Sequence, residues 1–142
     1  MRTYFDADVV IWLLRGHEAA IAQFDRLIGE PDIEMWMSAV QRAEIVMYMK
    51  ASEEKSTLEL LSLFHTEPVT EEVVDLAATF YRQWRSSHGI DVNDAILAAT
   101  AVLTGGRIIT LNTKHFPMPG VSAERGWEEG PGAESGPGLS SP

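Results

Sequence analysis

Short segments that favour β-strands alternate with helical patterns along most of the chain, and this alternation constrains the fold more than any other feature. The expected strands are residues 3–5, 33–37, 66–69 and 107–111. The expected helices are residues 8–14, 18–28, 38–50, 53–64, 71–87 and 94–103. Strands that alternate with helices are typical of a parallel sheet. The sequence therefore predicts a single α/β domain, with a central parallel sheet of four to five strands flanked by helices.

Local signals place the starts of two of these helices. Ser38 and Gln41 have the spacing of a capping box, which predicts that a helix begins there and contains Glu44. Asn93 is a good N-cap residue, so the last helix is expected to begin at Asp94. Asp94 would then occupy the first helical turn, where the helix dipole favours a negative charge.

Composition limits the class of protein. The chain has 142 residues, of which 45% are hydrophobic, and this is enough for one domain with a substantial core. It has no cysteine, which excludes disulfides and thiolate metal sites. No apolar run approaches the length of a membrane span, and the first residues do not have the pattern of a signal peptide. We therefore expect a cytoplasmic protein without a membrane segment.

Charge and low-complexity composition suggest the domain boundary. The net charge is −10, which argues against binding nucleic acid through a broad basic surface. Residues 126–142 contain five glycines, three prolines and three serines, so little apolar surface is available to offset the entropy of ordering. The sequence predicts a folded domain over residues 1–121 and an acidic, disordered tail over residues 122–142.

Four polar residues lie where expected strands or helices begin or end: Asp6, Glu44, Asp94 and Asn112. Asp6 and Asn112 follow strands, and ligands of parallel sheets gather beyond the carboxyl ends of the strands. Carboxylates brought close together repel one another unless a divalent cation, protons or basic partners neutralise them. Oxygen ligands suit Mg²⁺ or Mn²⁺ better than zinc. These four positions therefore predict one cation site.

Three segments carry a resemblance to a known family: residues 5–11, residues 38–44, and residues 91–101 through 110–116. In this order and spacing they resemble PIN-domain ribonucleases, most closely the VapC-type toxins of bacterial toxin–antitoxin pairs, over residues 3 to 121. The resemblance implies a toxin that is a metal-dependent endoribonuclease and hydrolyses RNA phosphodiester bonds. It also implies a cognate antitoxin as partner and a homodimer.

The resemblance also implies roles for individual residues. Asp6 and Asp94 correspond to the principal ligands of Mg²⁺ or Mn²⁺, and Glu44 to a further ligand or to the base that orients the attacking water. Asn112 takes a position where the family has an acidic or an amide residue, and as a neutral residue it leaves open whether one ion or two ions bind. Asp91 could supply the missing charge, although a solvated turn residue is the favoured interpretation, and Asp8 is equally ambiguous.

Other interpretations remain open at this point. Asp6 and Asp8 after a strand would also suit a phosphotransferase of the haloacid-dehalogenase type, but Thr110 then follows Asp94 in the wrong order for that class. A PIN-fold interaction module, with weak or no catalysis, is the second alternative. Basic residues near the predicted site are candidate phosphate contacts: Arg15, Arg42, Lys114 and His115.

Overall fold

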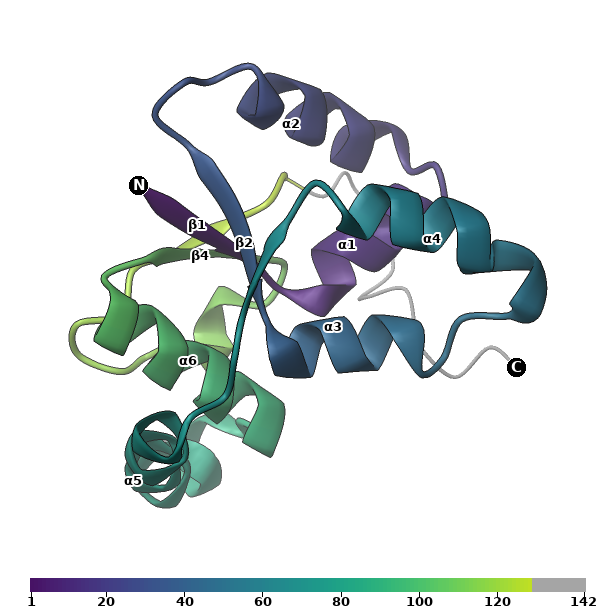
Figure 1. Cartoon of the computed structure of the whole chain (residues 1–142). Coiled ribbons are helices and arrows are strands. Elements are labelled where there is room, and N and C mark those ends of the chain that lie inside the picture. Colours follow the sequence, from purple (N-terminus) through teal and green to yellow (C-terminus); the bar gives the residue numbers. More distant parts are fainter. Residues whose placement is uncertain (129–142) are drawn as a thin grey trace.

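The computed structural model describes residues 1–128 and contains one parallel sheet of five strands in the order β3-β2-β1-β4-β5 (Figure 1). The strands are β1 (Arg2–Phe5), β2 (Glu34–Ser38), β3 (His65–Glu67), β4 (Arg107–Thr110) and β5 (Ala123–Arg125). The α-helices are α1 (Ala7–Leu14), α2 (Glu18–Ile28), α3 (Ala39–Val46), α4 (Glu54–Leu61), α5 (Glu71–His88) and α6 (Val92–Thr104). Two short 3-10 helices, η1 (Ala51–Glu53) and η2 (Thr113–His115), complete the described elements. The predicted α/β fold with a four- to five-stranded parallel sheet is confirmed.

The strand order reverses next to β1, and this determines where a ligand can bind. The chain runs from β1 outward to β2 and β3, and then returns to form β4 on the other side of β1. Phe5 of β1 pairs with Ile109 of β4, so these two strands end side by side. Because their connections leave in different directions, the carboxyl ends of β1 and β4 flank the crevice in which open α/β sheets bind ligands.

Each face of the sheet is covered by its own group of helices. Tyr4 and Ile108 belong to a core cluster with α5 and α6, whereas Phe5 and Ile109 belong to a second cluster with α1, α3 and α4. Neighbouring residues of a strand point to opposite faces, so both faces of β1 and β4 are buried. Figure 1 shows α5 and α6 on one side of the sheet and α1 on the other. Because helices cover both faces, the polar residues at the strand ends project from the edge of the sheet.

The folded domain extends beyond the predicted boundary at residue 121. β5 pairs in parallel with β4, with Thr110 opposite Arg125, and Trp127 packs against the second core cluster. Residues 123–125 were expected to lie in the tail, because a three-residue strand with two charged residues has no apolar pattern. The rest of the expected disordered tail, residues 129–142, lies outside the described residues. None of the helices in residues 1–128 is both long enough and apolar enough to cross a membrane.

Candidate active site at the carboxyl edge of the sheet

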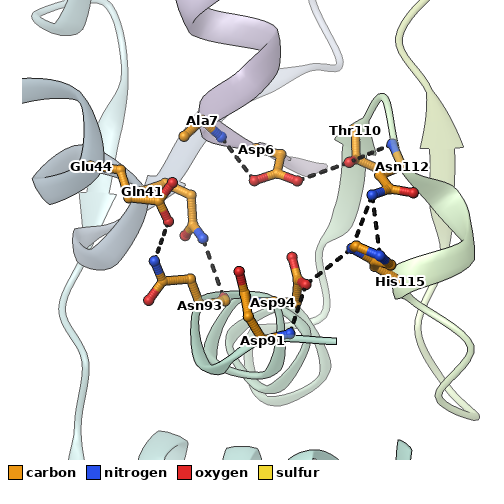
Figure 2. A network of polar contacts seen from close by, with 10 residues as sticks. All are labelled: Asp6, Ala7, Gln41, Glu44, Asp91, Asn93, Asp94, Thr110, Asn112 and His115. Atoms are coloured by element: carbon orange, nitrogen blue, oxygen red, sulfur yellow. Dashed lines mark hydrogen bonds and ion pairs between the residues drawn. The ribbon is translucent and has the colours of Figure 1, made fainter. Parts of the chain in front are cut away.

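Asp6 lies at the point where β1 ends and α1 begins. Its Oδ1 accepts the N–H of Ala7 at 2.9 Å, which caps α1, and its Oδ2 accepts the hydroxyl of Thr110 at 2.8 Å (Figure 2). Thr110 is the last residue of β4, so this contact spans the point where the strand order reverses. Burial raises the pKa of Asp6 to about 6, although both hydrogen bonds act in the opposite direction. The fold thus holds this carboxylate in a fixed orientation.

Glu44 approaches the same edge from α3 and is held by α6. The side-chain amide of Asn93 donates to Oε1 of Glu44 at 2.5 Å. Burial, followed by the negative charge of Asp6, raises the pKa of Glu44 to about 7, and the hydrogen bond from Asn93 lowers it. Glu44 therefore has a pKa close to neutrality, within reach of the field of Asp6.

Asp94 occupies the first turn of α6, as predicted, but the helix begins earlier than expected. Asp91, not Asn93, is the N-cap: its carboxylate accepts the N–H of Asp94 at 2.7 Å, and Oδ2 of Asp94 accepts the N–H of Asp91 at 3.0 Å. Burial is the main cause that raises the pKa of Asp94 to about 8, and the charges of Asp91 and Asp6 add to it. Figure 2 shows Asp91 and Asp94 projecting from the start of α6 toward Asp6.

Asn112 follows β4 but its side chain is directed to His115. Its Nδ2 lies 3.0 Å from Nδ1 of His115, and this Nδ1 lies 3.2 Å from Oδ2 of Asp94. Burial lowers the pKa of His115, so the neutral imidazole is favoured at this position. The Asn112 side chain thus reaches Asp94 through His115, and its backbone N–H donates to the Thr110 hydroxyl that is hydrogen-bonded to Asp6.

Asp8 is a further acid at this edge. Its carboxylate accepts the N–H of Val9 at 2.8 Å and also a backbone hydrogen bond from Leu111, so it links α1 to the segment after β4. Burial, followed by the charge of Asp6, raises the pKa of Asp8 to about 7. Asp91 is exposed, yet its charge raises the pKa values of Asp6, Glu44 and Asp94. The interpretation of Asp91 as only a solvated turn residue was therefore incomplete.

The donor set suits a hard divalent cation. All the acids offer oxygen atoms, and their negative charges raise one another's pKa values. No group of three or more His, Asp or Glu side chains within residues 1–128 is placed to hold a metal ion by itself. Mg²⁺ commonly binds through one or two carboxylates and keeps several waters, so a small set of carboxylates is compatible with it. The residues fit such an ion in donor chemistry and charge, with water or substrate oxygens completing the coordination.

The basic residues predicted as phosphate contacts occupy different surroundings. His115 contacts Asp94, and Lys114 is exposed one residue before it in η2. Arg15 lines a cavity with residues of α1, α3 and α4, and Arg42 is half-buried on α3. Lys114 is therefore an exposed cation next in sequence to His115, which contacts Asp94.

This fold, with its cluster of acids at the carboxyl edge, defines a class for which a family model exists. The model for the PIN domain matches residues 3–118, and the chain belongs to this family. Within it, the chain is similar to the ribonuclease VapC10 of Mycobacterium tuberculosis, with 36% identity over 115 residues that make up 80% of this chain and 84% of the relative. The ribonuclease VapC19 of the same species is 32% identical over 114 residues, or 80% of this chain and 90% of the relative.

A solved structure supports the same assignment. A chain of a toxin–antitoxin complex from Klebsiella pneumoniae superposes with a TM-score of 0.70 and 26% identity, covering 89% of this chain and 99% of that chain. The predicted resemblance to PIN-domain proteins of the VapC type is confirmed. The haloacid-dehalogenase alternative receives no support from these similarities.

Sequence reasoning placed the three acids at one edge of the sheet but missed two contacts there. The structure brings Asp6, Glu44 and Asp94 to one edge, as expected, with Asn112 at its border. The roles of Asn93 and Gln41 were not expected, because both had been interpreted as helix caps. For Asn93 the sequence signal was ambiguous, because Asn and Asp are equally good N-caps and the chain has Asp91 only two residues before Asn93.

Proposed function

We propose that this protein is a metal-dependent endoribonuclease that acts as the toxin of a toxin–antitoxin pair and hydrolyses RNA phosphodiester bonds. The observation that carries the proposal is the cluster of acids at the ends of β1 and β4, each with a raised pKa. The ribonuclease names of VapC10 and VapC19 supply the reaction class. A protein of that class has RNA as its substrate, and we propose the cytoplasm as its cellular location.

Asp6 and Asp94 would hold a Mg²⁺ or Mn²⁺ ion, with Glu44 as a further ligand or as the base. When bound, such an ion supplies charge neutralisation at the scissile phosphate and lowers the pKa of water for the attack. Thr110 and Ala7 fix the Asp6 carboxylate through their hydrogen bonds. Glu44, whose pKa is about 7, can accept a proton from the attacking water near neutral pH. Asn112 would orient His115 beside Asp94.

The partners follow from the solved structures of similar chains. The similar chain from Klebsiella pneumoniae comes from a toxin–antitoxin complex. We therefore assign a cognate antitoxin to this chain as its protein partner. A homodimer is proposed as its assembly on the resemblance to VapC-type toxins alone. With a net charge of −10, the chain is suited to a partner that carries basic residues.

RNA cleavage by the purified protein tests this function. We expect cleavage in Mg²⁺ or Mn²⁺, none in EDTA, and a loss of at least ~100-fold in Asp6→Asn and Asp94→Asn, because several kcal/mol of transition-state stabilisation depend on the ion. Asp75→Asn, at an exposed position of α5, is the matched control and should cleave at the unaltered rate. Cleavage that persists in EDTA, or unchanged rates in both site variants, would contradict the proposal. A folded protein that binds antitoxin but never cleaves RNA would favour the interaction module.

A further inference from the structure

Asn93 occupies a position where its residue type needs an explanation. It lies inside the first turn of α6, between Val92 and Asp94, and asparagine is a poor helix former away from the cap. The cap itself is Asp91, so the Asn93 side chain is not needed to satisfy the helix start. Its amide instead reaches across to α3 and donates to Glu44.

Glu44 is stabilised by such a donor. It is brought to the edge by a helix rather than by a strand end, and it lies in the field of Asp6 and Asp91, whose charges raise its pKa. A carboxylate repelled by its neighbours turns away from them unless a hydrogen bond holds it. The Asn93 amide provides this bond and favours the charged form of Glu44.

Gln41 fixes Asn93 in turn. Its side chain is buried, with 1% exposure, and its Nε2 donates to the backbone carbonyl of Asn93 at 3.3 Å. The Oε1 of Gln41 has no hydrogen-bond partner among the described residues, which is an unfavourable state for a buried amide. The contact with Asn93 thus sets the first turn of α6 against α3, one helical turn from Glu44.

From these contacts we infer that Asn93 is a positioning residue, which orients the Glu44 carboxylate toward the cation and is itself held by Gln41. This inference rests on the proposed metal-dependent function and extends it to a residue behind the acids. Groups that hydrogen-bond a metal ligand set its orientation, and their loss typically costs ~10–100-fold in metal affinity. The alternative is that Asn93 only joins two helices.

A double-mutant cycle on Mn²⁺ affinity, measured by calorimetry, distinguishes the two. We expect Asn93→Ala to weaken Mn²⁺ binding by ~10-fold in the unaltered protein and by less than ~2-fold in the Glu44→Ala background, because its effect passes through Glu44. Asn93→Leu, which keeps the number of side-chain heavy atoms but removes the donor, should behave in the same way if Asn93→Ala folds poorly. Gln83→Ala removes an exposed amide from α5 and should leave affinity unchanged.

The cycle also has clear contrary results. An equal loss of affinity in both backgrounds, or no loss in either Asn93 variant, would overturn the positioning role while leaving the nuclease proposal intact. A protein that binds no Mn²⁺ at all would overturn the inference and the metal part of the proposed function together. RNA cleavage by the unaltered protein, measured in parallel, separates these cases.

Discussion

Two regions of the same sheet treat charge in opposite ways. Where β1 and β4 begin, each arginine has an acidic partner: Arg2 lies 3.0 Å from Glu67, and Arg107 lies 3.1 Å from Glu124. Arg2 also lies over the ring of Trp36, 3.7 Å from its centroid. These contacts join the outer strands β3 and β5 to the two central strands. Charge around these two arginines is balanced, and their ion pairs stabilise the sheet.

At the carboxyl edge the charge is not balanced. Asp6, Asp8, Glu44 and Asp94 all have pKa values raised first by burial. The imidazole that contacts Asp94 has a lowered pKa and brings little positive charge. The comparison shows that the same sheet has paired charges around its arginines and clustered acids at its carboxyl edge. Repulsion and burial of these acids cost free energy, and a bound divalent cation would remove that cost.

In the comparison of the two regions, the largest effect is expected for an acid of the carboxyl edge. Glu44→Gln should lower RNA cleavage by ~100-fold or more, because a positioned general base typically contributes ~10²–10⁴-fold. Glu67→Gln, which removes an acid from the balanced region, should leave the rate within ~2-fold. Single-turnover cleavage at pH 7.5 with saturating Mn²⁺ measures both. Equal losses in the two variants would remove the distinction between the regions.

The same pair of variants should have opposite effects on stability without metal. The pKa of Glu44 in the folded state, about 7, lies above its ordinary value of 4.5. Its contribution to stability is therefore present below the lower value and is lost as pH rises through the higher one. In EDTA at pH 8, Glu44→Gln should therefore increase the free energy of unfolding by ~1–2 kcal/mol. Glu67→Gln should decrease it by up to ~1 kcal/mol, because an ion pair with Arg2 is lost.

Urea denaturation at pH 5 and at pH 8 checks both signs. At pH 5 the stabilisation by Glu44→Gln should shrink, since Glu44 is then largely protonated in the folded protein. Destabilisation by Glu44→Gln at pH 8 in EDTA would show that this carboxylate stabilises the fold, as the paired acids do.

The smallest expected effect concerns the neutral member of the predicted site. Asn112→Asp adds a charge beside His115 and Asp94, which should strengthen Mn²⁺ binding by ~3–10-fold, the equivalent of about 1 kcal/mol. Calorimetry also reports whether the number of bound ions changes. Gln83→Glu adds the same charge at an exposed position of α5 and should change affinity by less than ~2-fold. Indistinguishable affinities in these two variants would mean that Asn112 lies outside the field of the site.

The sequence was sufficient for four of the five strands and for placing the acids at one edge of the sheet. Alternating strand and helix patterns have a strong hydrophobic period, and parallel strands bring Asp6 and Thr110 to one edge wherever their exact ends lie. The first turn of α6 was equally predictable for Asp94, because helix-start signals cluster there. These features depend on patterns many residues long, which tolerate errors of one or two positions.

Contacts that depend on a single rotamer or a few residues could not be predicted. Both Asp91 and Asn93 could cap α6. Asp91 does so, and the Asn93 side chain instead forms a hydrogen bond with Glu44 of α3. The Asn112 side chain contacts His115 because the 3-10 turn of η2 brings these two residues close together. β5 is too short for a period of its own and is recognised by its pairing with β4.

Calorimetric titration with Mn²⁺ at pH 7, in two buffers of different ionisation enthalpy, tests most directly whether the carboxyl edge is a cation site. Because burial raises the pKa of Glu44 to about 7 and that of Asp94 to about 8, an ion that binds there should displace protons. We predict Mn²⁺ binding with net proton release, and a loss of both affinity and proton release in Asp94→Asn. Absence of binding, or binding that releases no protons and is unchanged in Asp94→Asn, would contradict the account.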